Sequence, residues 1–252
     1  MTPLLSTRGL TIRFGGHTAV DNVSADFHAG QLTVIVGPNG AGKTTYFNLM
    51  SGQLPATSGQ VLLRGEDITR SGPASRTRQG IGRAFQLTNL FPHLPVHENV
   101  RLAVQAHAKA GMRMWSVWSN HKELIERADH YVDRVALAGR RNTLVAALSH
   151  GDKRKLEVAM MLALEPEVMM FDEPTAGMSV DEVPVVLDLI HLVKAERNKA
   201  ILLVEHKMDV VRALADRIIV LHNGALVADG EPAAVMSSAI VQDAYLGSAN
   251  HD

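Results

Sequence analysis

The chain has 252 residues, of which 46% are hydrophobic and 20% are charged, and its formal net charge is −1. This is the composition of an ordinary globular protein with a full core, and the near-zero charge excludes a strong overall attraction to nucleic acid or anionic lipid. The absence of cysteine from the sequence excludes disulfides, zinc–thiolate sites and thiol catalysis.

Hydrophobic residues near the N-terminus do not form the apolar core of a signal peptide. The longest uninterrupted apolar run, residues 158–164, is far shorter than the roughly 18 to 20 residues that a membrane-spanning helix needs. We therefore expect a soluble, cytoplasmic chain that acts at a membrane only through partners.

Short apolar runs in the first quarter of the chain lie among turn residues. The runs at 10–14, 20–28 and 60–63 each fit a strand, and the turn pairs Gly15-Gly16 and Arg64-Gly65 lie beside them. Strands joined by short turns pair antiparallel. We expect a small antiparallel β subdomain here.

A Gly-rich motif, GPNGAGKT, occupies residues 37–44 between an apolar run and a helical pattern. Glycines let backbone N–H groups converge on phosphate oxygens, and the N-terminus of the following helix adds its positive end. We expect Lys43 to contact the β- and γ-phosphates of ATP and the Thr44 hydroxyl to complete a Mg²⁺ shell. The residues predicted to bind nucleotide here are Gly37, Pro38, Asn39, Gly40, Ala41, Gly42, Lys43, Thr44 and Thr45.

The middle of the chain, from about residue 88 to residue 164, has no convincing strand pattern. Residues 96–108 and 120–137 instead place apolar side chains at helical spacing, which predicts two amphipathic helices. We expect a helical subdomain inserted at this point.

The remaining strand-like runs alternate with helical runs, which predicts an α/β fold with a mostly parallel sheet. The core strands are expected at 33–36, 168–172, 200–205 and 217–221. After the last of these, Asn223-Gly224 is the signal of a β-hairpin turn.

Two adjacent carboxylates, Asp172 and Glu173, follow the buried run at 168–171. Successive side chains of a strand point to opposite sides, so the two acids can do different work. Asp172 is placed to hold Mg²⁺ through its water shell, and Glu173 is placed to polarise the attacking water as a general base.

The sequence LSHGD at 148–152, followed by a basic helical run, resembles the signature motif of ATP-binding cassette (ABC) proteins, whose usual form is LSGGQ. Other family elements occur in order along essentially the whole chain: Phe14 matches the aromatic that stacks on adenine, Gln86 the Q-loop glutamine, and His206 the switch histidine. Phe14 could instead be a core aromatic at the end of a strand.

The resemblance implies a P-loop NTPase fold of the RecA-like type and a head-to-tail pair of nucleotide-binding domains. Ser149 and Gly151 of one domain would then close over the ATP held by the other. His206 would orient the water next to Glu173, and Gln86 would contact Mg²⁺ and report nucleotide occupancy to partners.

Three positions depart from the family pattern. His150 stands where Gly is usual, Asp152 where Gln is frequent, and Ser179 where many members have Asp. These residues mark either a subfamily variant or a weakened signature in a degenerate site. Separately, Trp115 and Trp118 form an apolar patch that either docks on a membrane component or packs between helices.

The segments GIGRAFQ at 80–86, LFP at 90–92 and VHENV at 96–100 resemble the ATP-binding subunits of branched-chain amino acid importers. That resemblance implies a bacterial-type importer in which the chain lies at the cytoplasmic face of the inner membrane. Its implied partners are two transmembrane permeases, a second ATPase subunit of the same or a different kind, and indirectly an extracytoplasmic solute-binding protein, with no nucleic acid.

We expect one nucleotide-binding domain, with the ATP-binding core and β subdomain at 1–87 and 165–252 and the helical subdomain at 88–164. Two alternatives stay open: an exporter ATPase of the lipopolysaccharide type and a soluble, non-transport cassette ATPase. In the importers that the chain resembles, the ATPase subunit does not contact the transported solute, so the sequence does not identify that solute.

Overall fold

The structure is a computed structural model that describes residues 2–84, 90–108, 122–176, 178, 183–238 and 241. Several sequence expectations therefore lie outside the described residues: those for Gln86, Trp115, Trp118 and Ser179.

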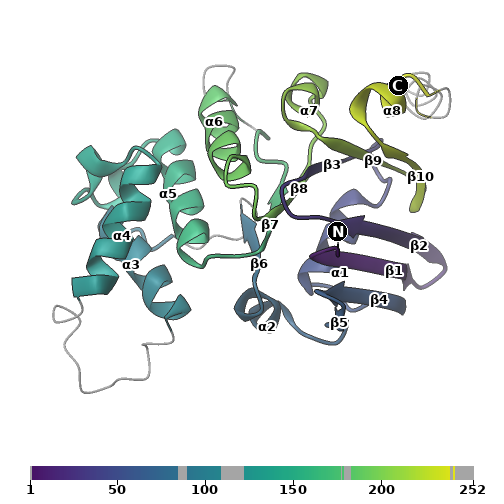
Figure 1. The fold of residues 1–252 in the computed structure, drawn as a ribbon, viewed down its shortest axis with the longest axis horizontal. Helices are drawn as coiled ribbons and strands as arrows, with labels where there is room; N and C mark the ends of the chain where they lie inside the picture. The colour runs from purple at the N-terminus through teal and green to yellow at the C-terminus, as the bar shows by residue number, and fades with distance from the viewer. Residues whose placement is uncertain are drawn as a thin grey trace.

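The larger sheet has six strands in the order β10-β9-β3-β8-β7-β6 (Figure 1). The strands are β3 (Leu32–Val36), β6 (Ile81–Ala84), β7 (Val168–Asp172), β8 (Ala200–Val204), β9 (Arg217–His222) and β10 (Ala225–Gly230). All neighbours pair parallel except β9 and β10, which form the expected antiparallel hairpin. Every residue of β3, β7 and β8 is buried, as in parallel strands covered on both faces.

The smaller sheet is antiparallel in the order β2-β1-β4-β5. It consists of β1 (Leu5–Phe14), β2 (His17–Phe27), β4 (Ser58–Leu63) and β5 (Glu66–Asp67). β1 begins five residues before the expected position because its polar start is buried: Thr7 Oγ1 lies 2.7 Å from the hydroxyl of Tyr46. A tertiary hydrogen bond of this kind leaves no apolar run in the sequence.

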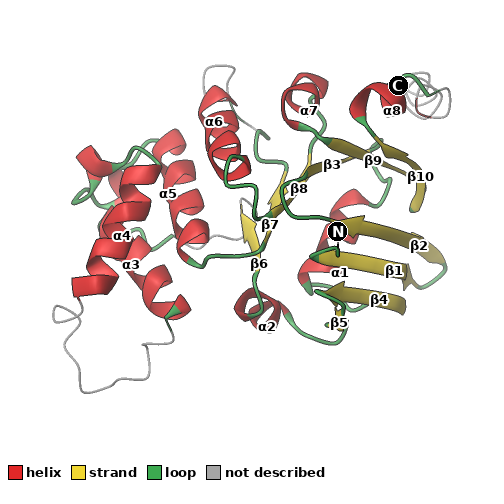
Figure 2. Ribbon diagram, viewed as in Figure 1, coloured by secondary structure: helices red, strands yellow, loops and turns green. Residues whose placement is uncertain are grey.

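The helices are arranged around the large sheet (Figures 1 and 2). The helices α3, α4 and α5 pack against one another beyond the β6 edge, on the opposite side of the molecule from the small sheet. They are α3 (Val96–His107), α4 (Lys122–Arg134) and α5 (His150–Ala163). The others are α1 (Lys43–Ser51), α2 (Pro73–Arg78), α6 (Val183–Lys194), α7 (Met208–Leu214) and α8 (Pro232–Met236).

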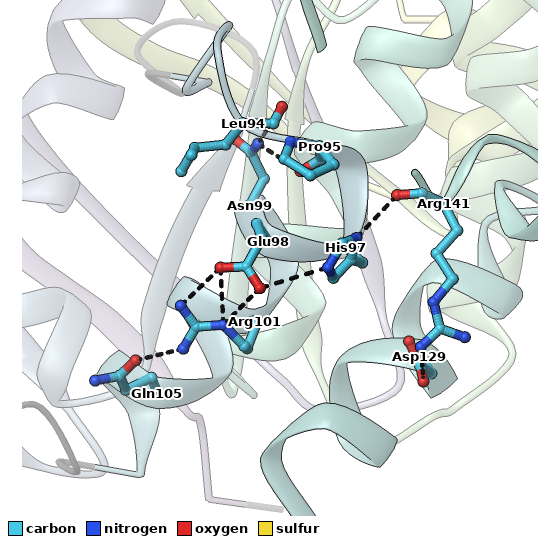
Figure 3. Close-up of polar contacts among 9 residues, drawn as sticks. All are labelled: Leu94, Pro95, His97, Glu98, Asn99, Arg101, Gln105, Asp129 and Arg141. Atoms are coloured by element: carbon cyan, nitrogen blue, oxygen red, sulfur yellow. Dashed lines mark hydrogen bonds and ion pairs between the residues drawn. The ribbon is translucent and has the colours of Figure 1, made fainter. Parts of the chain in front are cut away.

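A polar network fixes the start of α3 (Figure 3). The Asn99 side chain is fully buried and donates hydrogen bonds to the carbonyl oxygens of Leu94 at 3.4 Å and Pro95 at 3.0 Å. Two residues after Asn99, Arg101 donates to Glu98 at 2.8 Å. The hydrogen bonds of Asn99 fix the backbone of residues 94–95, which lead into α3.

The hydrophobic core is divided by the large sheet. One hydrophobic cluster lies between one face of the large sheet and helices that include α5 and α6. The other cluster lies between the opposite face, α1 and the small sheet. No helix among the described residues is long and apolar enough to span a membrane.

Candidate nucleotide-binding site

The Gly-rich loop connects the C-terminal end of β3 to α1, and close contacts require two of its glycines, Gly37 and Gly42. A Cβ atom at Gly37 would lie 2.1 Å from the carbonyl oxygen of Leu221, and one at Gly42 would lie 2.3 Å from that of Ala19. The loop is therefore held between β2 and β9, and Gly42 has a φ of 95° that favours glycine. A Cβ at Gly40, in contrast, would meet no described atom within 4 Å.

The N-terminus of α1 has the character of an anion-binding site. Its N-cap residue is Gly42, which has no side chain to accept hydrogen bonds from the first N–H groups of the helix. The N–H groups of Lys43, Thr44 and Thr45 precede the first helical bond, which Tyr46 donates to the Gly42 carbonyl at 2.8 Å. Free donors at a positive helix end suit phosphate oxygens.

Lys43 is buried within the loop. Its ammonium group donates hydrogen bonds to the carbonyl oxygens of Gly37 at 2.8 Å and Pro38 at 2.9 Å. Burial lowers the pKa of Lys43, while the charges of Glu173 and Asp172 act to raise it. The loop thus holds a preformed cation beside its own N–H groups.

Asp172 ends β7 and is buried. Its Oδ2 accepts a hydrogen bond from Arg83 at 2.6 Å, whereas Oδ1 has no hydrogen-bond partner among the described residues. Burial raises the pKa of Asp172, and the adjacent Arg83 charge acts to lower it. A buried carboxylate oxygen with no partner fits the oxygen ligands that Mg²⁺ prefers, as does the half-buried Thr44 hydroxyl.

Glu173 and His206 meet at the ends of two neighbouring strands. His206 Nε2 lies 2.7 Å from Glu173 Oε1, and Glu173 has a φ of 47°, a rare conformation for a residue with a side chain. Its backbone N–H donates to Val204 at 2.9 Å, which fixes this turn against β8. Strained backbone of this kind concentrates at functional sites.

Sequence reasoning missed Glu205 and Arg83. Glu205 is buried, accepts a short hydrogen bond from the Thr175 hydroxyl and accepts one from the His206 N–H at 2.6 Å, so it fixes the backbone that carries His206. The only feature of the sequence that could have indicated this role is that Glu205 is a carboxylate at the end of an apolar strand. Arg83 lies inside the GIGRAFQ motif, and nothing in the sequence indicates that its side chain pairs with the buried Asp172.

The signature residues lie elsewhere in the molecule. Ser149 is the N-cap of α5 and its hydroxyl accepts a hydrogen bond from the Asp152 N–H at 3.1 Å. A Cβ at Gly151 would meet no described atom within 4 Å. Because α5 belongs to the helical group and α1 lies across the sheet, one chain does not bring Ser149 and Gly151 to its own Gly-rich loop (Figure 1).

Phe14 ends β1, pairs with His17 across the hairpin and is 50% exposed. It is therefore not a core aromatic. The same hairpin contacts the Gly-rich loop through Ala19, so Phe14 lies on the strand pair that flanks this loop.

Comparison with known proteins identifies the family. The profile of the ABC transporter family matches residues 20–176. The high-affinity branched-chain amino acid transport ATP-binding proteins LivG of Escherichia coli K12 and BraF of Pseudomonas aeruginosa are each 36% identical over 98% of this chain and 99% of their own length. Among solved structures, the ADP conformation of MJ1267, an ATP-binding cassette of an ABC transporter, has a TM-score of 0.83 at 27% identity and covers 98% of this chain and 100% of that chain.

A nucleotide-free ATP-binding cassette from an ABC transporter is similar as well, with a TM-score of 0.81 at 27% identity, covering 96% of this chain and 98% of that chain. These likenesses confirm the predicted P-loop NTPase fold, with its parallel core, antiparallel sheet and helical group. The chain belongs to the ABC transporter family, as an ATP-hydrolysing subunit.

Proposed function

We propose that this chain powers the uptake of branched-chain amino acids or related small polar solutes through two separate membrane permeases. The main support for this proposal is the similarity of the chain to LivG and BraF over nearly its full length. The chain also has the residues expected of an ATPase, among them Lys43, Asp172 and Glu173. The chain would work as a peripheral subunit at the cytoplasmic face of a bacterial inner membrane. The relatives do not favour the exporter or the soluble alternative.

The geometry of the site suits ATP hydrolysis. Lys43 and the first N–H groups of α1 would bind the phosphates, and Phe14 would stack on the adenine. Glu173 would polarise the attacking water, and His206, 2.7 Å from Glu173 Oε1, would keep that carboxylate and the water in line. Glu205 supports the assignment because it holds the His206 backbone in place.

Magnesium would be held by Asp172 and Thr44, with Gln86 as the further expected ligand, and it would neutralise charge on the β- and γ-phosphates when bound. The partnerless Asp172 Oδ1 supports this assignment.

The complete ATP site would be shared between two subunits arranged head to tail. Ser149 is exposed and the space beside Gly151 is open, so both can approach a nucleotide held by a partner. The N-terminus of α5 would add its positive end. His150 and Asp152 would then mark a subfamily variant of the signature, because Lys43 and Glu173 are both present.

The test is capture of the tagged chain from its native membranes in mild detergent. We expect two multi-span permeases and a second cassette subunit to co-purify. Reconstituted in proteoliposomes with the solute-binding protein, the complex should accumulate leucine or a related solute only when ATP is supplied at the ATPase side. A Glu173→Gln complex is the matched control and should not accumulate solute. Recovery of ribosomes, or of no membrane partner, would overturn the importer assignment.

A further inference from the structure

We propose that Arg83 is a positioning residue for the magnesium site: its guanidinium group orients Asp172 and ties that carboxylate to the phosphate-binding helix. Arg83 lies on β6 and Asp172 at the end of β7, and their side chains meet at 2.6 Å. This inference rests on the proposed function, because it assigns a role within the same ATP site.

The contact with Asp172 leaves one oxygen for the metal. Arg83 donates to Oδ2, and Oδ1 is buried without a hydrogen-bond partner among the described residues. The side chains of Arg83 and Asp172 are only 9% and 2% exposed, so water does not screen the pair. Removal of the guanidinium group would leave a buried carboxylate without its partner, which is strongly unfavourable.

The other end of Arg83 reaches α1. Its Nη1 donates to Asn48 Oδ1 at 2.7 Å and to Ser51 Oγ at 3.0 Å. Asn48 lies four residues after Thr44, which places the two side chains on the same face of the helix, one turn apart. Arg83 thus links the carboxylate of one predicted magnesium ligand to the helix face that carries the other.

The ring of Phe47 adds a further constraint, since the Arg83 guanidinium carbon lies 5.8 Å from the ring centroid. Cations at this distance from an aromatic face are attracted to it. The carboxylate, amide, hydroxyl and ring contacts together restrict the orientation of the Arg83 side chain. Groups that hydrogen-bond to metal-ligating carboxylates orient those ligands, and their loss typically weakens metal binding by about 10- to 100-fold.

The experiment compares the full-length wild type with Arg83→Met, which keeps a flexible apolar side chain but removes the charge and all donors. Electron paramagnetic resonance measures Mn²⁺ binding in the presence of AMP-PNP, and a fluorescent ATP analogue measures nucleotide affinity with Mg²⁺ and with EDTA. We expect Mn²⁺ affinity to fall by roughly tenfold or more, while nucleotide affinity in EDTA changes by less than about twofold.

Two variants separate positioning from general stability. Arg83→Lys keeps a charge beside Asp172 but cannot also reach Asn48 and Ser51, so its Mn²⁺ affinity should lie between wild type and Arg83→Met. Arg8→Met is the matched control: Arg8 is also a strand residue, and its ion pair with Asp26 is 2.7 Å long but exposed. It should leave Mn²⁺ affinity unchanged. If Arg83→Met does not fold, the Mn²⁺ affinities of Arg83→Lys and Asn48→Ala test the positioning role of Arg83 instead.

Unchanged Mn²⁺ affinity in the Arg83 variants would overturn the inference, as would tighter binding, which would mean that the guanidinium charge competes with the metal. Equal losses of nucleotide affinity with Mg²⁺ and with EDTA would show a structural role only. A wild type that binds no nucleotide would instead contradict the proposed function, so the two failures are distinguishable.

Discussion

At the scale of single residues, the proposed ATP site contains several buried charges that are held by specific partners. Lys43 is bound by loop carbonyls, Asp172 by Arg83, and Glu205 by Thr175 and the His206 backbone. Each would be unfavourable if buried alone, since an unpaired buried charge costs several kcal/mol. The site is therefore organised before nucleotide binds, which reduces the ordering required on binding.

Replacement of Lys43 by alanine should weaken ATP binding by roughly tenfold or more, because it removes a charged hydrogen-bond donor to phosphate. Equilibrium titration with a fluorescent ATP analogue measures the change. Lys194→Ala is the control, since the ion pair of Lys194 with Asp216 joins α6 to the segment between α7 and β9 rather than to the Gly-rich loop. Equal affinity of Lys43→Ala and wild type for ATP would contradict the loop assignment.

Motif spacing predicted the Gly-rich loop and the acid pair, because each lies where a strand ends and carries a residue type that its chemistry requires. The family resemblance predicted His206. Arg83 and Glu205 were not predicted. Arg83 contacts an acid 89 positions away and Glu205 a hydroxyl 30 positions away, so only the folded sheet brings these groups together. The positions of Ser149 and Gly151 relative to ATP stay a prediction, because they depend on a second subunit.

At the scale of elements, the fully buried strands were predictable from continuous apolar runs. β7 has the expected bounds, and β3, β8 and β9 differ by one residue at one end. β6 was not predicted as a strand, because its four residues include a glycine and the charged Arg83. Its partner in the sheet is β7, so tertiary pairing overrides the weak local signal.

The helical group is fastened to the core partly by Glu165, between α5 and β7. Its carboxylate accepts hydrogen bonds from Arg127 at 2.5 Å and Tyr131 at 2.9 Å, both on α4. Burial raises the pKa of Glu165, but hydrogen bonds from Tyr131 and Arg127 and the Arg127 charge outweigh burial, and the pKa lies below its ordinary value of 4.5.

A lowered carboxyl pKa contributes stability above the unfolded value, and this contribution is lost as the pH falls through the folded value. Glu165→Gln should therefore lower the free energy of unfolding at pH 7 by at most about 1 kcal/mol, because the pair is partly exposed. The difference from wild type should shrink toward pH 4, as measured by urea denaturation. Glu66→Gln, at an exposed position on β5, is the control. A difference that grows in acid would contradict the assignment.

At the scale of the whole molecule, the fold separates the two groups of residues that we propose form an ATP site. The Gly-rich loop, Asp172, Glu173 and His206 gather at the ends of the parallel strands, whereas Ser149 and Gly151 lie in the helical group. A second subunit arranged head to tail would unite them. ATP would then join the subunits, and its hydrolysis would release them, which is how such a subunit would drive movement in membrane partners.

The most direct test is to measure ATP turnover by the purified chain and by its Glu173→Gln variant. Glu167→Gln is the matched control, because Glu167 lies just before β7 and forms a partly exposed ion pair with Arg64. We expect Glu173→Gln to bind ATP as the wild type does but to hydrolyse it roughly 10²- to 10⁴-fold more slowly, since it lacks the general base. Glu167→Gln should retain wild-type turnover. Undiminished hydrolysis by Glu173→Gln would contradict the central claim that the Glu173 carboxylate, beside His206, activates water for ATP hydrolysis.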